Sequence, residues 1–287
     1  MLFSKIDLPN QRLIQNAHIQ LDLKRLDLVH PNISGNKFFK LKYNLQQAQQ
    51  QQKMGVLTFG GAYSNHIAAT AYAAHALGLQ SIGIIRGDEL AQRPLNPTLK
   101  TAQKFGMQLQ FISRQQYLQR HAPEFLQNLV AKYPDFAIIP EGGTNSLAIQ
   151  GCSEILSPQD LANYDLFCCA VGTGGTLAGL IESSQAQHQL LGFSALKGDF
   201  LTTEVRQLTQ KCNWQILDDY CCGGYAKTTP ELIQFMYQFE AKYHIPLEQI
   251  YTAKMLMGLF DLIQKDYFAS GTKILAIHTG GLQGRQI

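Results

Sequence analysis

Two lysines one helical turn apart suit amine chemistry. Residues 34–41 read SGNKFFKL, which places Lys37 on a glycine and asparagine turn at the start of a helical segment and Lys40 one turn further along. A lysine forms an imine with a carbonyl only when its amine can lose a proton, and partial burial or a cationic neighbour favours that loss. Lys40 would be that neighbour. Most lysines are solvated, so this interpretation depends on the other motifs of the chain.

A glycine-rich loop is suited to binding an anion. Residues 171–179, VGTGGTLAG, follow an apolar run and open a helical one, so backbone amides and hydroxyls would surround a phosphate at a helix N-terminus. The groups expected there belong to Gly172, Thr173, Gly174, Gly175 and Thr176. The spacing from Gly172 does not match a dinucleotide fingerprint, and no acidic residue follows where one would bind a ribose. The alternative is a tight turn without a ligand.

A second glycine turn is suited to binding a carboxylate. Residues 60–66, GGAYSNH, join an expected strand to an expected helix, which Ser64 or Asn65 would cap while the loop amides face outward. The alternative is an ordinary capping turn, with His66 as a packed and hydrogen-bonded residue.

Hydroxyl groups near the end of the chain complete the set. Residues 251–254 (YTAK) start a helix and residues 278–281 (HTGG) close the last strand, so Thr252 and Thr279 could meet a ring nitrogen or a substrate. Tyr225 lies on a glycine turn, where the alternative is a core or lid aromatic. An amine, a phosphate loop and a carboxylate loop together indicate a cofactor that carries an aldehyde and an anionic group. Our candidate is pyridoxal 5'-phosphate.

The elements that position these motifs follow an α/β pattern. Short apolar runs alternate with helical stretches, which is typical of parallel α/β architecture. We expect strands at residues 56–59, 81–85, 108–112, 137–139, 166–171, 190–195 and 273–277. We expect helices at about residues 64–77, 97–105, 115–132, 147–156, 204–211, 230–243 and 253–268, and another from residue 176. The glycine motifs follow strands, and ligands bind at that edge of open α/β sheets.

The composition narrows the class of protein. A chain of 287 residues with 45% hydrophobic residues can bury the core of one large or two moderate domains. The 24 basic and 21 acidic residues are spread along the chain, which does not favour nucleic-acid binding. We see no apolar run long enough for a membrane helix and no secretory signal, and therefore expect a cytoplasmic protein. The six cysteines are expected as reduced thiols, without a metal site.

In their order and spacing, these motifs resemble the pyridoxal-phosphate enzymes of the D-cysteine desulfhydrase and 1-aminocyclopropane-1-carboxylate deaminase family. The resemblance runs from Arg25 to the end of the chain. That family has the tryptophan-synthase-β-like fold, also called fold type II. The resemblance therefore implies two three-layer α/β domains with mostly parallel sheets and the cofactor in the cleft between them. The implied large domain comprises residues 1–42 and 146–287, and the small domain comprises residues 43–145. A homodimer is also implied.

The resemblance also implies roles for single residues. Lys37 would bind the cofactor as an imine and remove the α-proton of a small amino acid. The phosphate would be held by Lys40 and residues 172–176. Asn65 would bond the ring hydroxyl, with Thr252 and Thr279 near the ring nitrogen. The implied substrate-binding residues are Ser64, Asn65 and His66, and those implied in proton transfer or attack are Ser64, Tyr225 and Tyr251.

Departures from the family pattern bear on the reaction. Thr252 stands where the deaminases have a glutamate that faces the pyridine nitrogen, and Phe38 and Phe39 replace an arginine-containing spacer. A neutral hydroxyl holds that nitrogen protonated less well than a carboxylate does, so opening a cyclopropane becomes harder than expelling a β-substituent. We therefore predict α,β-elimination, as in D-cysteine desulfhydrase. The alternatives are the deaminase, a catalytically silent protein that binds the cofactor, and, more distantly, a nicotinamide dehydrogenase.

Overall fold

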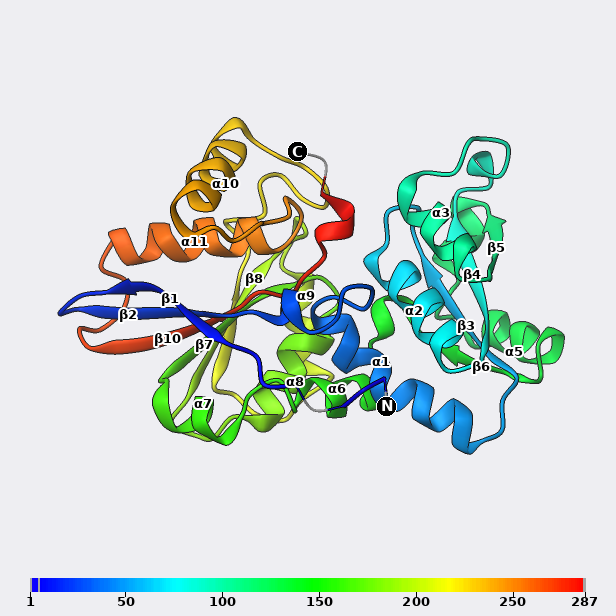
Figure 1. Ribbon diagram of the computed structural model, residues 1–287, viewed down its shortest axis with the longest axis horizontal. Coiled ribbons are helices and arrows are strands. Elements are labelled where there is room, and N and C mark those ends of the chain that lie inside the picture. Colours follow the sequence, from blue (N-terminus) through cyan, green and yellow to red (C-terminus); the bar gives the residue numbers. More distant parts are fainter. Residues whose placement is uncertain (1, 5, 286–287) are drawn as a thin grey trace.

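Two β-sheets divide the molecule into two lobes, as Figure 1 shows. The structure is a computed structural model that describes residues 2–4 and 6–285. The large lobe contains a six-stranded sheet of order β1-β2-β10-β7-β8-β9. Its strands are β1 (Asn10–Gln15), β2 (Ile19–Lys24), β7 (Leu166–Val171), β8 (Gln189–Ser194), β9 (Trp214–Leu217) and β10 (Thr272–Ile277). Only the hairpin pair β1 and β2 is antiparallel.

Helices cover both faces of the large sheet. Along β7, Phe167, Cys169 and Val171 face one hydrophobic core while Cys168 and Ala170 face the other, as the two-residue period of a strand requires. The first core is completed by α1 (Asn36–Gln50), α6 (Ser146–Cys152), α8 (Gly175–Ser183) and α9 (Phe200–Arg206). The second is completed by α10 (Pro230–Tyr243) and α11 (Thr252–Gln264). The lobe therefore has three layers.

The small lobe repeats this plan around four parallel strands in the order β5-β4-β3-β6. These are β3 (Gly55–Gly60), β4 (Gln80–Arg86), β5 (Met107–Ile112) and β6 (Phe136–Ile139). Helices α2 (Asn65–Ala76) and α3 (Pro97–Lys104) pack on one face, and α4 (Arg114–Leu118) and α5 (Pro123–Lys132) pack on the other. Both lobes are thus α/β layers on mostly parallel sheets, which confirms the expected fold class.

Several elements differ from the sequence-based expectation. The helix expected over residues 115–132 is two helices, because Pro123 has no amide proton and disfavours a helical residue before it. Strands β1, β2 and β9 and helix α7 (Pro158–Asn163) were not expected. The helix expected at residues 204–211 lies at Phe200–Arg206 instead.

The two sheets point their carboxyl edges toward one another across α1. Helix α1 begins at the large lobe and runs into the small lobe (Figure 1), and it packs against α6 and α2. The domain limits implied by resemblance, at residues 42 and 146, stay a prediction because α1 spans the first of them. Short 3₁₀ turns lie at Leu26–Leu28, Asp88–Leu90, Glu141–Gly143 and Leu282–Gly284.

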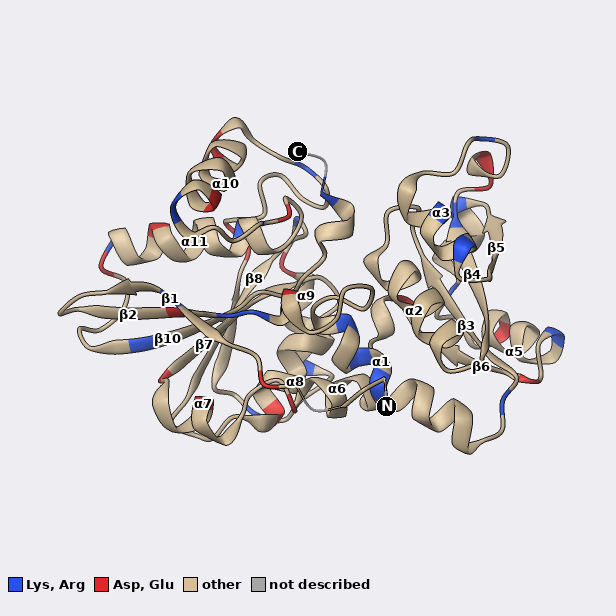
Figure 2. Ribbon diagram, viewed as in Figure 1, with Lys and Arg blue, Asp and Glu red and all other residues tan. Residues whose placement is uncertain are grey.

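Charge is distributed over both lobes. Figure 2 shows basic residues gathered at the start of α1, between the lobes, with acidic residues scattered elsewhere. Within the described chain, each helix is too short or too polar to cross a membrane. The six cysteines are free thiols, of which Cys212 is exposed and Cys222 half-buried.

Candidate active site

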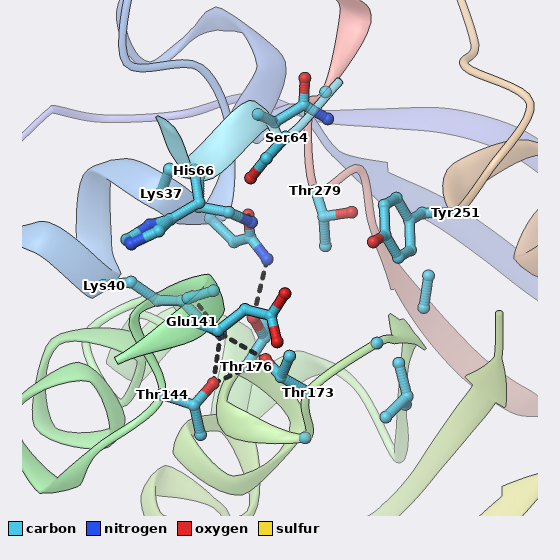
Figure 3. Close-up of a pocket in the computed structure, with 18 of the residues that line it drawn as sticks. Lys37, Lys40, Ser64, His66, Glu141, Thr144, Thr173, Thr176, Tyr251 and Thr279 are labelled. Atoms are coloured by element: carbon cyan, nitrogen blue, oxygen red, sulfur yellow. Dashed lines mark hydrogen bonds between the residues drawn. The ribbon is translucent and has the colours of Figure 1, made fainter. Parts of the chain in front are cut away.

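A cavity of about 560 Å³ lies between the lobes, at the carboxyl edges of both sheets. The glycine loops expected at the strand ends line it, together with the start of α1. Figure 3 shows Lys37, Ser64, Thr279 and Tyr251 around the same hollow. The structure therefore brings together segments of both lobes that lie far apart in the chain, such as those of Ser64 and Thr279.

Lys37 lies in the first turn of α1, at the cavity wall. Gly35, with φ +70°, precedes the helix, and a Cβ there would lie 1.8 Å from the carbonyl oxygen of Thr279. Only glycine therefore allows α1 to begin against the 278–281 loop. The Lys37 amine donates a hydrogen bond to Asn36 Oδ1 over 2.9 Å. Burial and the nearby charge of Lys40 lower the pKa of Lys37 to about 7, so the amine is readily neutral.

Lys40 joins loops of the two lobes. Its buried Nζ donates to the carbonyl oxygen of Gly142 over 3.0 Å and to the hydroxyls of Thr144 over 3.0 Å and Thr173 over 3.2 Å. Burial lowers the pKa of Lys40 from its usual value. No carboxylate of the described residues pairs with it, so an anion in this part of the cavity would meet an uncompensated charge.

The glycine loop of residues 172–176 leads into the N-terminus of α8. Gly174 has φ +74° and precedes the first turn of α8. Among the described residues, nothing accepts a hydrogen bond from the backbone N–H of Gly174, Thr176 or Leu177. Gly175 lies just behind the cavity, where a Cβ would reach within 2.8 Å of the Thr144 hydroxyl. Free amides at a helix N-terminus beside a buried lysine are suited to a phosphate.

The 60–66 loop presents three neighbouring side chains at the start of α2. Ser64 caps the helix by accepting from the Ile67 amide over 3.4 Å. The Asn65 Oδ1 atom is buried and has no partner among the described residues. The His66 ring is buried and its Nε2 lies 2.8 Å from the Thr58 hydroxyl. Burial and the charges of Lys37 and Lys40 hold the His66 pKa well below its usual value, so this ring is neutral.

Two tyrosines close the opposite wall. The rings of Tyr225 and Tyr251 meet edge to face with centroids 6.2 Å apart. Tyr251 packs so closely on Gly172 that a Cβ there would lie 2.9 Å from its ring. Burial raises the pKa of both phenols, that of Tyr251 by more, so both stay protonated at neutral pH. Tyr225 is 43% exposed and lies at the mouth.

Thr252 lies elsewhere than expected. It is fully buried, and its hydroxyl contacts the carboxylate of Glu248 over 3.2 Å instead of facing the cavity. Glu248 also accepts from the backbone N–H groups of Ile250, Tyr251 and Thr252 at 2.6–2.7 Å, which fixes the start of α11. Thr252 is therefore not among the residues that line the cavity, because its hydroxyl contacts Glu248 at the start of α11. Thr279, the other expected hydroxyl, does line the cavity.

Three charged residues of the small lobe line the cavity without having been assigned a role from the sequence. Glu141 accepts from the hydroxyl of Tyr117 over 2.7 Å and from Arg120 Nε over 2.5 Å. In Figure 3 its carboxylate points into the cavity. Arg86 ends β4 and also reaches the cavity. In the sequence, Glu141 lies in the motif PEGG of residues 140–143, which is part of the family resemblance, whereas Arg86 is marked only by its strand-end position and Arg120 by nothing.

These groups fit an aldehyde that carries a phosphate. Lys37 offers a neutral amine, while Lys40 and the free amides of Gly174 and Thr176 offer an anion site. The unpartnered Asn65 oxygen offers an acceptor for a ring hydroxyl. Buried polar atoms without partners are unfavourable, so an unpartnered oxygen on a residue that lines the same cavity as this anion site indicates that a ligand completes the site.

Comparisons with known proteins agree with this chemistry. A candidate 1-aminocyclopropane-1-carboxylate deaminase of Thermotoga maritima is 29% identical over 96% of this chain and 92% of that protein. The mitochondrial bifunctional D-cysteine desulfhydrase/1-aminocyclopropane-1-carboxylate deaminase of Arabidopsis thaliana is 30% identical over 92% of this chain and 73% of that protein. The crystal structure of an ACC deaminase homologue matches with a TM-score of 0.84 and 27% identity, covering 99% of this chain and 92% of the other. The family profile described as "Pyridoxal-phosphate dependent enzyme" matches residues 8–280, and this chain belongs to that family.

Proposed function

We propose that this enzyme removes the β-substituent of a small amino acid by α,β-elimination, as a D-cysteine desulfhydrase does. The products are a 2-oxo acid, ammonia and the released substituent. The observation that carries the proposal is the Lys37 amine, whose pKa is about 7. This amine lines the same cavity as the 172–176 loop, suited to an anion, and the 60–66 loop, suited to a carboxylate. The name of the Arabidopsis thaliana relative supports it.

The cofactor pyridoxal phosphate would be held by groups from both lobes. Lys37 would bind its aldehyde, residues 172–176 with Lys40 its phosphate, and Asn65 its ring hydroxyl. Thr279 would offer a hydroxyl to the ring nitrogen. When bound, this cofactor withdraws electrons from the α-carbon and so makes the α-proton acidic.

Side chains of the cavity would then carry out the proton transfers. Ser64 and the amides of its loop would hold the substrate carboxylate, with the neighbouring His66 keeping the loop in place. Once the amino group of the substrate has replaced Lys37 on the aldehyde, the released and neutral Lys37 amine would take the α-proton. Tyr251 and Tyr225, both protonated, would donate a hydrogen bond or a proton to the departing group. The Cα–H and Cβ–X bonds break, X leaves with the bonding electrons, and water converts 2-aminoacrylate to the 2-oxo acid and ammonia.

A second candidate function is 1-aminocyclopropane-1-carboxylate deamination, which the names of the relatives favour. One observation counts against it. Of the residues expected near the ring nitrogen, the one that lines the cavity is Thr279, which offers a hydroxyl and not a carboxylate. A ring nitrogen that is less fully protonated stabilises negative charge at the α-carbon less well.

One set of assays separates these functions. The purified protein should be yellow, and borohydride should fix the cofactor on Lys37. D- and L-cysteine, 3-chloroalanine, serine and the cyclic amino acid are then tested for release of a 2-oxo acid. Release from cysteine or chloroalanine supports elimination, while release from the cyclic substrate alone supports the deaminase. A yellow protein that converts none of them would be a silent binding protein, and a colourless one would refute the proposal.

We propose further that the enzyme acts in the cytoplasm as a homodimer. Free thiols, four of them buried, suit a reducing compartment. The family resemblance supports the dimer. Light scattering of the purified protein tests it, since a molar mass equal to one chain would exclude it.

A further inference from the structure

The cations around the cavity differ in what neutralises them. Lys37 and Lys40 are the groups proposed to bind the cofactor aldehyde and the cofactor phosphate. Arg120 is paired with Glu141 over 2.5 Å. Arg86 also lines the cavity, yet no described residue forms an ion pair with it or accepts a hydrogen bond from its side chain. The small lobe therefore presents one exposed guanidinium without an ion-pair partner to the space where the substrate would bind.

Arg86 stands beside the carboxylate loop. It ends β4, next to the strand that leads into residues 60–66. Its Nη2 atom would lie 3.5 Å from a Cβ on Gly61, and its guanidinium carbon lies 5.8 Å from the centre of the Tyr117 ring. Burial raises the pKa of Tyr225 across the cleft, and the charge of Arg86 acts against that rise. Arg86 thus lies between the 60–66 loop and the mouth of the cavity.

The other anionic parts of the expected ligands already have partners. The phosphate has Lys40 and the 172–176 amides, and the α-carboxylate has the 60–66 loop. The remaining carboxylate that lines the cavity belongs to Glu204. Its charge acts on His121, where it partly offsets the lowering of the His121 pKa by burial and by Arg120. An arginine fork matches the planar or tetrahedral oxygens of a carboxylate, phosphate or sulfonate. Arg86 is therefore available for a further oxyanion.

We propose that Arg86 is a specificity residue that binds a second anionic group on the substrate. The inference rests on the proposed elimination and names its substrate class: amino acids whose β-substituent carries an oxyanion. Elimination breaks the Cα–H and Cβ–X bonds, and X departs with the bonding electrons as the free anion. S-sulfocysteine would release thiosulfate and O-phosphoserine would release phosphate, each with a 2-oxo acid and ammonia after hydrolysis.

Binding of two unreactive acids to the holoenzyme tests the proposal. Succinate and butyrate have four carbons each and no amino group, but only succinate carries a second carboxylate. Isothermal titration calorimetry should show succinate binding about tenfold more tightly, which is the effect of one charged hydrogen-bonded contact. Arg86→Gln should abolish this preference. Arg93→Gln removes an exposed arginine of the same lobe that does not line the cavity, and should preserve it.

Two binding results would overturn the proposal. One is equal affinity of the unmodified enzyme for succinate and butyrate. The other is an equal loss of both affinities in Arg86→Gln, which would show that Arg86 serves the α-carboxylate.

Turnover separates this inference from the proposed function. 3-Chloroalanine, S-sulfocysteine and S-(2-aminoethyl)cysteine, in both configurations, offer a small, an anionic and a cationic β-substituent. We expect kcat/KM to favour S-sulfocysteine over the cationic substrate by about tenfold or more, and Arg86→Glu to reverse the order. Turnover of chloroalanine without such a preference would refute the role of Arg86 alone. Turnover of none would refute the elimination, and the succinate measurement would then decide the role of Arg86.

Discussion

At the scale of single residues, the proposed chemistry depends on the protonation states of Lys37 and Tyr251. Burial and the charge of Lys40 lower the pKa of Lys37 to about 7, while burial keeps the phenol of Tyr251 protonated well above its usual range. A base and a proton donor therefore coexist at neutral pH within one cavity. The two states arise because burial disfavours the charged form of both groups: the neutral form of a lysine is the base, and the neutral form of a tyrosine is the acid.

The reaction of Lys37 with an aldehyde should follow its titration. A lowered lysine pKa means that the neutral amine gains population as pH rises through about 7, rather than above pH 10. The rate at which cofactor-free protein reacts with pyridoxal, which has no phosphate, should therefore rise with a midpoint near pH 7. Lys40→Met removes the neighbouring charge and should move the midpoint upward. A rate in the unmodified protein that rises only above pH 9 would contradict this account.

The two tyrosines should differ in importance. Tyr251 is more deeply buried and packs on Gly172, whereas Tyr225 is 43% exposed at the mouth. Tyr251→Phe should lower kcat by about a hundredfold, the usual effect of losing a proton donor, with cofactor affinity unchanged. Tyr225→Phe should have a smaller effect, because water can replace its hydroxyl. Steady-state kinetics with 3-chloroalanine measures both, and the reverse order would refute the assignment.

At the scale of elements, close backbone contacts place the helices that carry the site. The first turn of α1 packs against the 278–281 loop through Gly35, and α11 begins where Glu248 accepts three backbone amides. Each contact lies beside a cavity residue, Lys37 in the first case and Tyr251 in the second. The positions of the reactive groups therefore depend on contacts made outside the cavity.

Substitution of Gly35 should show this dependence. Gly35→Ala would place a Cβ 1.8 Å from a backbone oxygen, so α1 must move; Gly78→Ala has the same sign of φ, +71°, with nothing within 4 Å. We expect Gly78→Ala to lower the free energy of unfolding by about 1 kcal/mol, because alanine disfavours this backbone conformation. Gly35→Ala should lower it clearly more, because the contact is lost as well. Urea unfolding measures both costs. The Gly35 variant should also lose cofactor binding, and equal costs would refute the role of the contact.

The sequence predicted those elements whose pattern is local. The parallel strands β3, β4, β7 and β8 are apolar runs that end near glycine or polar residues. Strand β2 was missed because Asp22 and Lys24 interrupt its apolar pattern, and the structure buries both against partners far along the chain, such as Asp160 at 2.8 Å from Lys24.

The same limit applies to the site. Motif residues such as Lys37 and Ser64 could be named because their glycine turns mark them. Arg86 and Arg120 carry no such motif, and only the packing of the small lobe turns them toward the cavity. The contact of Thr252 with Glu248 could not be read from the motif, because Glu248 lies four residues earlier and outside it.

At the scale of the whole molecule, the cavity is shared between the lobes. Lys40 lies on the helix that connects them and contacts Gly142 of one lobe and Thr173 of the other. An anion bound to this lysine would contact both lobes at once. Its binding free energy would therefore add to the stability of the entire fold.

Inorganic phosphate should raise the melting temperature of cofactor-free protein. The rise should increase with the logarithm of phosphate concentration, because phosphate binds the native state. Lys40→Met should remove most of the rise. Lys42→Met is the matched control, because Lys42 lies on the same helix but pairs with Glu154 outside the cavity. Differential scanning fluorimetry provides the measurement, and an equal loss in both variants would argue against a phosphate site at Lys40.

The separation of the anion loop, in the large lobe, from Arg86 and Ser64, in the small lobe, has an evolutionary consequence. Mutations between β3 and β6 that spare Asn65 could alter which amino acid is accepted, while Lys37, Lys40 and the 172–176 loop would still retain the phosphate and aldehyde ends of the coenzyme. Descendants of one ancestor can then acquire new substrates by drift in one half of the chain, and recombination of small lobes among relatives offers a route to new activities.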